Sequence, residues 1–209
     1  YCFSNQLTSL DVSSNTLLER FSCSYNQITS LDFSSCTLLE YLQCFYNQLT
    51  SIDVTSCTLL ETLECNINQL PSLDVSSCTS LTELRCEENQ LTSLDVSFCT
   101  LLQNLNCGAN QITSLDISSN TSITSLACEN NLITSLDLSS ININADDINA
   151  TNNQLSYVLM PDTLNHIKYF DLRNNMIDSI DFPSSRYLDI LFFYLTDNNL
   201  KELDLTTVY

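Results

Sequence analysis

Cysteine is the first residue type in this sequence whose number and spacing suggest chemistry. Seven cysteines recur with a 21-residue step, at Cys2, Cys23, Cys44, Cys65, Cys86, Cys107 and Cys128. Zinc sites usually place cysteines in closely spaced pairs or combine them with histidines, and His166 is the only histidine of the chain. Equivalent side chains on stacked strands point the same way, which suits an unstrained disulfide poorly. We therefore expect these cysteines to act as small apolar side chains stacked along a core.

A second cysteine column has the same period and comprises Cys36, Cys57, Cys78 and Cys99. Asn15 and Asn120 take its position in other copies, so the position tolerates a polar group. Eleven cysteines cannot all pair within one chain. Two interpretations of this column stay open: exposed, more reactive thiols, or free structural thiols, which we favour.

Aspartate forms a third column, six residues after a recurring asparagine, at Asp11, Asp32, Asp53, Asp74, Asp95, Asp116, Asp137, Asp181 and Asp204. Stacked carboxylates are oxygen ligands that would suit calcium. The alternative is a local turn in which each carboxylate accepts hydrogen bonds from following backbone N–H groups. We favour the turn, because the Gly-rich loops of known repeat calcium sites are missing.

Catalysis is not indicated by any group of residues. His166 has no recognisable partner motif, and Gly108 is the only glycine, which excludes Gly-rich phosphate loops. The formal net charge of −19 disfavours nucleic acid and anionic membrane surfaces, which need clustered Lys and Arg. No apolar run is long enough for direct membrane insertion. We expect no enzyme activity, cofactor or metal, whereas cationic partners and neutral glycans remain possible.

The element that must position these columns is a 21-residue repeat of the form LxxLxCxxNQLTSLDVSSCTxL. Its asparagines are Asn5, Asn26, Asn47, Asn68, Asn89, Asn110 and Asn131. In one copy, Leu39, Leu42 and Cys44 should point inward from a short strand, and the following Asn47 amide should satisfy backbone groups at the turn. The return arm is too short for a regular helix, so we expect extended or 3₁₀ structure there. The predicted fold is a right-handed leucine-rich-repeat solenoid with a parallel β-sheet on its concave face and little or no α-helix.

The whole chain, residues 1–209, is predicted to be a single solenoid. Residues 1–138 hold regular repeats, and residues 139–209 hold degenerate repeats of 22–23 residues with Asn153, Asn175 and Asn198 in the asparagine position. End coils of a solenoid need polar caps, and no cap is recognisable before Cys2 or after Leu205. We expect both termini to be truncated.

The cysteine in the third strand position, the 21-residue period and the LTSLDVSxxT arm resemble internalin-J-like leucine-rich repeats. The consensus sequence of the repeat is also similar to that of secreted surface proteins of Bacteroidota. The resemblance covers residues 1–140 closely and the remainder loosely. It implies a bacterial cell-surface or extracellular protein whose repeats support adhesion or recognition.

The outward positions of the concave sheet vary between coils and provide the candidate ligand-binding residues. Aromatic candidates are Tyr1, Phe3, Tyr25, Tyr41, Phe45 and Tyr46. Charged candidates are Glu61, Glu64, Glu83, Glu87 and Glu88, grouped around Arg85. Lys168, Tyr169, Arg173, Phe192 and Tyr194 follow towards the C-terminal end. Exposed aromatic groups are typical of binding hot spots, but aromatic residues also simply suit half-buried strands.

Two functions follow, and both remain open. The solenoid is a recognition module that binds a protein or glycan ligand, or it is a rigid spacer that contacts the flanking domains or subunits of a larger surface assembly. The aromatic and acidic groups favour the former, and near-perfect repetition suits the latter.

Overall fold

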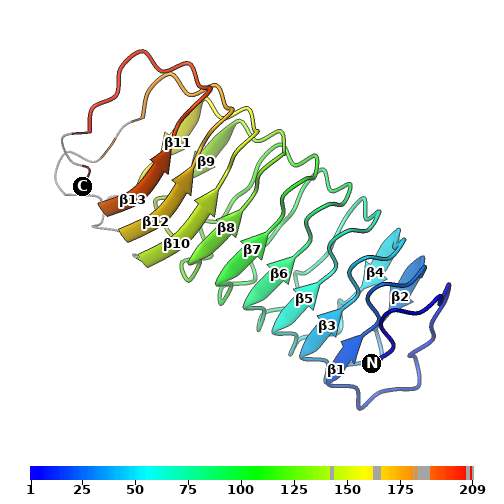
Figure 1. Cartoon of the computed structure of the whole chain (residues 1–209). Helices are drawn as coiled ribbons and strands as arrows, with labels where there is room; N and C mark the ends of the chain where they lie inside the picture. Colours follow the sequence, from blue (N-terminus) through cyan, green and yellow to red (C-terminus); the bar gives the residue numbers. More distant parts are fainter. Residues whose placement is uncertain (142–143, 162–165, 181, 183–188, 206–207, 209) are drawn as a thin grey trace.

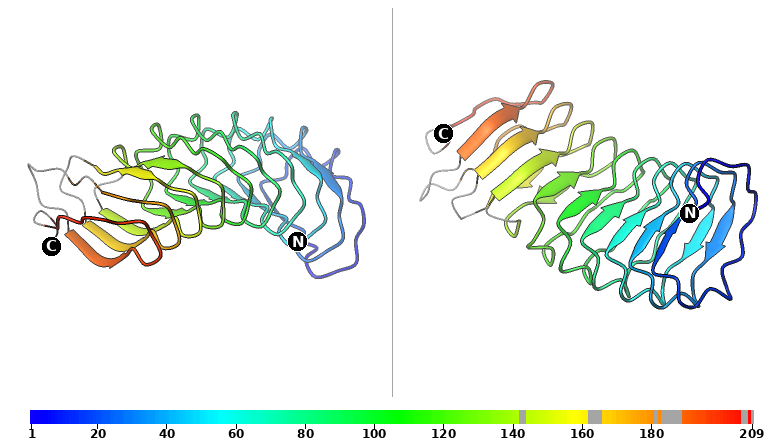
Figure 2. Two further views of the ribbon diagram at one scale, coloured as in Figure 1. Left: turned by 90° about the horizontal axis from the view of Figure 1, so that it is seen from above. Right: turned by 60° about the horizontal axis from the view of Figure 1, so that its bottom comes forward.

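The chain forms an elongated solenoid in a computed structural model that describes residues 1–141, 144–161, 166–180, 182, 189–205 and 208 (Figure 1). One parallel sheet of nine strands runs along it, in the order β1-β3-β5-β6-β7-β8-β10-β12-β13. Its strands are β1 (Arg20–Ser22), β3 (Tyr41–Gln43), β5 (Thr62–Glu64), β6 (Glu83–Arg85), β7 (Asn104–Asn106), β8 (Ser125–Ala127), β10 (Asn144–Asn149), β12 (His166–Asp171) and β13 (Asp189–Tyr194). The solenoid bends into an arc with this sheet on its inner side (Figure 2), which confirms the predicted fold class.

The outer arms are extended segments joined by turns. Four of them form two local pairs, β2 (Ser30–Asp32) with β4 (Ser51–Asp53), and β9 (Ser135–Asp137) with β11 (Tyr157–Leu159). Within the described residues no segment is helical, and the arms consist of extended segments and turns, as predicted for arms too short for a regular helix. Accordingly, nothing in that part of the chain is a helix that could cross a membrane.

The core lies between the inner sheet and the outer arms. In the third strand of the chain, β3, Leu42 points inward and is fully buried, while Tyr41 and Gln43 on either side are half-exposed. The strand is shorter than the LxxLxC pattern predicts, because it covers three residues and leaves Leu39 and Cys44 outside it. Both of these side chains are nevertheless fully buried, as predicted.

The sheet continues without interruption from the regular repeats into the degenerate ones. β8 pairs with β10 in parallel register, with Leu126 opposite Ile148. Strands lengthen from three residues in the regular coils to six in β10, β12 and β13. Because register is kept, side chains at equivalent positions form rows across the concave face, and the residue types along each row determine its relief and charge.

Candidate functional site

The asparagine column is a continuous hydrogen-bond ladder along one edge of the sheet. In a representative rung, Asn68 Nδ2 donates to the carbonyl oxygens of Cys65 at 3.0 Å, Asn66 at 3.2 Å and, one coil back, Cys44 at 3.1 Å. Its Oδ1 accepts the N–H of Leu49 at 2.9 Å. The amide therefore satisfies four backbone groups of two coils, as the sequence predicts, and the rungs extend through Asn153, Asn175 and Asn198.

A residue in the left-handed conformation precedes each asparagine of this ladder. This conformation was not predicted from the sequence. Positive φ values occur at Ser4, Tyr25, Tyr46, Ile67, Glu88, Ala109, Asn130, Asn152, Asn174 and Asp197. Three of these positions hold asparagine, the non-glycine residue that best tolerates this conformation. Asparagine at these positions is the signal from which the left-handed turn could have been predicted. The side chains of the aromatic candidates Tyr25 and Tyr46 and of the acidic candidate Glu88 project from this turn.

The first cysteine column is buried, with only Cys2 partly exposed, and all eleven thiols are free. Cys44 Sγ donates to the Glu64 carbonyl at 3.6 Å, and Cys86 Sγ donates to that of Asn106 at 3.5 Å. Burial raises the pKa of Cys65 and Cys107 to about 12, so these thiols stay neutral. The expectation of a stacked apolar column is confirmed.

The second cysteine column behaves as a second, weaker donor ladder. Cys57 Sγ lies 3.7 Å from the carbonyl oxygens of Phe33 and Cys36, which lie 24 and 21 residues back. At the equivalent place Asn120 Nδ2 donates to Val96 at 2.9 Å and Cys99 at 2.8 Å. The alternative of exposed, reactive thiols is therefore wrong, because the four cysteines are fully buried and occupy a position that needs a donor.

The aspartate column forms the local turns that we favoured. In one copy Asp74 Oδ1 accepts the Ser76 N–H at 2.9 Å and the Ser76 hydroxyl at 2.7 Å, and these bonds lower the pKa of Asp74. The same backbone bond occurs at Asp11, Asp32, Asp53, Asp95, Asp116 and Asp137. Asp181 lies outside the described residues. Over the described ranges, no three or more acidic, cysteine or histidine side chains meet in a way that could hold a metal ion.

His166 has a partner that the sequence did not reveal. Its Nδ1 lies 2.7 Å from Asp189 Oδ2 on the neighbouring strand β13, and both side chains are about half-exposed. On its other side the register partner is Asn144.

Tyr25, Phe45 and Tyr46 form one contact group at the N-terminal end of the concave face, here called the aromatic cluster. The Tyr25 and Tyr46 rings stack with centroids 4.9 Å apart, and Phe45 meets Tyr25 edge-on at 5.2 Å. Tyr25 remains 48% and Tyr46 52% exposed. Tyr41 lies outside this cluster, under the guanidinium of Arg20 at 5.0 Å. Tyr1 and Phe3 are exposed.

The acidic candidates divide into three environments. Glu83 binds Arg85 Nε at 2.8 Å, and Glu64, opposite Arg85 in register, accepts Gln43 Nε2 at 3.1 Å. Burial raises the pKa of Glu87, with Glu129 and Glu88 adding to the effect and Arg85 opposing it. Glu88 and Glu61 are exposed, Glu88 in the left-handed turn and Glu61 just before β5. The structure therefore brings Glu64, Glu83 and Glu87 around Arg85, as predicted, and leaves Glu61 at the margin.

A hollow of about 340 Å³ lies on the concave sheet between β6 and β10. Its floor is formed by the small side chains of β7 and β8, and its walls by larger side chains of β6 and β10. The polar residues that line it are Glu83, Arg85, Asn104, Asn106, Ser125 and Asp147. The hollow exists because small residues occupy two neighbouring strands of an in-register sheet. None of the candidate residues predicted from the sequence lies on β7 or β8, so the hollow was not expected from the sequence.

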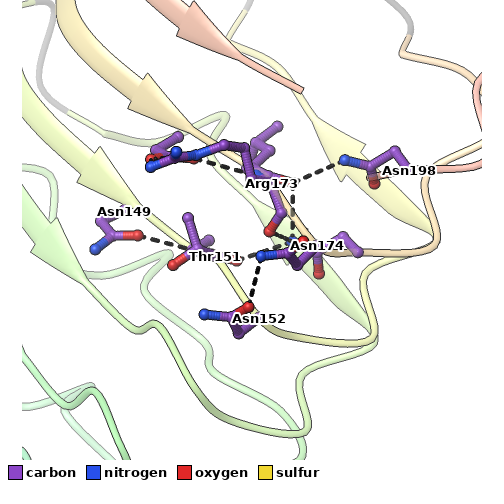
Figure 3. Close-up of polar contacts among 10 residues, drawn as sticks. Asn149, Thr151, Asn152, Arg173, Asn174 and Asn198 are labelled. Atoms are coloured by element: carbon purple, nitrogen blue, oxygen red, sulfur yellow. Dashed lines mark hydrogen bonds and ion pairs between the residues drawn. The ribbon is translucent and has the colours of Figure 1, made fainter. Parts of the chain in front are cut away.

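At the C-terminal end the concave face is aromatic again. Tyr169 on β12 and Phe192 on β13 stack with centroids 4.9 Å apart, and the Arg173 guanidinium lies 5.2 Å from the Tyr194 ring. Figure 3 shows the polar contacts beside this region, where the rung Asn198 and an additional bond from Asn174 Nδ2 to Asn152 Oδ1 at 2.8 Å tie successive coils together.

Comparisons with known proteins agree with this geometry. A family model described as leucine-rich repeats (2 copies) matches residues 16–56. The functional domain of internalin J from Listeria monocytogenes, which includes a cysteine ladder, superposes with a TM-score of 0.82 at 37% identity, covering 99% of this chain and 45% of that one. The comparison with curated proteins gave no match.

More distant structures share the fold alone. The leucine-rich effector YopM from Yersinia pestis gives a TM-score of 0.72 at 22% identity, covering 99% of this chain and 65% of that one. The plant peptide hormone receptor RGFR1, in complex with RGF2, gives a TM-score of 0.66 at 16% identity, covering 90% of this chain and 37% of that one. The chain thus spans less than two thirds of the length of each of these three structures. With its cysteine ladder, 21-residue period and asparagine rungs, it is a leucine-rich-repeat protein of the internalin-J-like type.

Proposed function

We propose that the chain is a non-catalytic recognition module that binds a protein ligand through its concave sheet, at the cell surface or outside the cell. Leucine-rich repeats of this type are generally protein-binding, and the resemblance to internalin J supports the location. The aromatic cluster is the observation that carries the proposal. The Phe45 and Tyr46 rings both contact Tyr25, which pre-orders the three rings, and two of them stay about half-exposed, so a ligand can bury them at little entropic cost.

The rigid-spacer alternative is tested by the same experiment. The purified chain is screened against arrays of surface proteins and of glycans, alongside the triple variant Tyr25→Asn/Phe45→Ser/Tyr46→Asn. These replacements come from equivalent positions of the chain itself, since Asn130 is also left-handed and Ser24 corresponds to Phe45. The variant therefore removes the rings while keeping side chains that the coil accepts.

We expect the triple variant to lose at least about tenfold in affinity for a captured protein, as for a cluster of hot-spot residues. The control Phe98→Ala/Leu101→Ala removes comparable exposed apolar surface from the outer arms and should bind normally. Unchanged melting curves verify the fold. Binding that survives in the triple variant contradicts the proposed site, capture of glycans alone contradicts a protein ligand, and no binding at all favours the spacer.

A further inference from the structure

We infer that the hollow between β6 and β10 receives a lysine or arginine side chain of the protein ligand. The inference rests on the recognition function proposed above and adds the chemistry of the partner. The hollow is three strand steps wide from β6 to β10, or about 14 Å at the usual strand spacing. That width accommodates an extended ligand chain with one long side chain directed at the sheet.

The charges around the hollow favour a cation. Glu83 lies on one wall and Asp147 on the other. Arg85 is neutralised by Glu83 at 2.8 Å and also feels Glu64 and Glu87. Asp171 near the hollow is bound by Arg173 Nε at 2.9 Å. Asp147, by contrast, makes no ion pair with any residue that the structure describes, so its charge is available to a ligand.

Asp147 also lies close to other carboxylates in the free protein. Burial raises its pKa, and the neighbouring carboxylates Asp171 and Asp146 raise it further. A cation placed beside Asp147 would relieve this repulsion. Asn104 and Ser125 on the floor add side-chain oxygens that can accept hydrogen bonds from an ammonium or guanidinium group.

A basic side chain fits the hollow better than a sugar does. The lining has no aromatic ring on which a sugar ring could stack, and its carboxylates accept hydrogen bonds but donate none. The net charge of −19 attracts basic partners over a long range. The aromatic cluster lies about four coils away, or about 19 Å, which an extended peptide spans with about six residues.

The test uses a fluorescein-labelled pentalysine peptide and the same peptide with acetylated lysines, measured by fluorescence anisotropy. We expect pentalysine to bind and the acetylated peptide to lose binding. Asp147→Asn should weaken pentalysine binding about fivefold, as expected for one partly desolvated charge contact. In a ¹⁵N-labelled sample, the amides of Asn104 and Ser125 should shift on titration.

Asp95→Asn is the matched control, because it removes one charge from the outer arm while its side-chain oxygen can still accept the Ser97 N–H. It should change pentalysine binding by less than about twofold. Equal weakening by Asp95→Asn and Asp147→Asn would show diffuse attraction and overturn the inference, as would absence of pentalysine binding. A captured protein that is lost by the aromatic triple variant but not by Asp147→Asn overturns the hollow and leaves the proposed function standing.

Discussion

The carboxylate of Glu129 occupies the space in which a side chain of Gly108 would begin. A β-carbon built on Gly108 would lie 2.6 Å from Glu129 Oε1 and 2.7 Å from its Cδ. Glu129 Oε2 is buried and makes no hydrogen bond with the described residues, and the same is true of Glu87 Oε2 on the other side of Gly108. The only glycine of the chain thus creates a gap into which a carboxylate folds at an electrostatic cost.

Gly108→Ala should leave the protein as stable or stabilise it by about 0.5–1 kcal/mol, because alanine restricts the unfolded chain. The backbone accepts a side chain here, since the equivalent positions hold Phe45, Asn66 and Glu87. The clashing atoms end a flexible side chain, which can swing into water. Urea unfolding of Gly108→Ala, Glu129→Ala and the double variant measures the coupling. A loss of more than about 1 kcal/mol would show that Glu129 cannot move away.

Glu87 should make the protein less stable as the pH rises. Burial raises the pKa of Glu87 in the folded state above its value in the unfolded chain. A raised folded pKa contributes stability that is fully present below the unfolded pKa and is lost as the pH rises through the folded pKa. Glu87→Gln should therefore raise the Tm at neutral pH, by about 1–2 °C for a chain of this size, and flatten the Tm profile above the ordinary range of glutamate.

Glu61→Gln is the control for this effect, because it removes the same charge from an exposed glutamate that does not contribute to the raised pKa of Glu87. It should leave the shape of the pH profile unchanged. A Tm for Glu87→Gln that runs parallel to the parent across the acidic range would refute a raised pKa at this position.

The thiols should be protected from alkylation in the native protein, apart from Cys2. Ten of the eleven cysteines are buried. Burial, with nearby acidic or thiol groups, raises the pKa of Cys57 and Cys78 to about 12, so that thiolate is scarce even at moderately alkaline pH. Iodoacetamide labelling followed by mass spectrometry should modify Cys2 alone in the native state and all cysteines in concentrated guanidinium chloride. Fast native labelling in the second column would contradict the buried donor ladder.

Much of the fold could be predicted from the sequence, because each rung repeats the same physical solution. The period, the inward leucines, the asparagine amides and the aspartate turns are local patterns that recur in nearly every coil, so their roles show in residue type alone. The strand length was overestimated, since burial extends over LxxLxC while strand pairing covers only three residues. The donor role of the second cysteine column became visible only with the carbonyl oxygens that lie 21 and 24 residues back.

The candidate site was less predictable, because it depends on which side chains meet across coils. Six aromatic residues looked equivalent in the sequence, yet Phe45 and Tyr46 both make ring contacts with Tyr25, and Tyr41 contacts Arg20 instead. The partner of His166 lies 23 residues away, one step of the degenerate repeats, and only the pairing of β12 with β13 shows that the two side chains meet. The hollow results from the sizes of side chains on four strands, which no single motif encodes.

Ile67 holds the left-handed position at which other coils place asparagine, and its replacement should stabilise the protein. Its φ is 54°, a conformation that is particularly unfavourable for a β-branched side chain. Ile67→Asn should relieve about 1 kcal/mol of backbone strain. Part of this gain is offset by the stability lost when the partly buried apolar surface of Ile67 is removed. Ile67→Leu separates the two effects, because it keeps the apolar surface and removes the branch at Cβ. We expect both variants to unfold at higher urea concentrations than the parent, and a lower midpoint for Ile67→Leu would show that branching at this turn carries no strain.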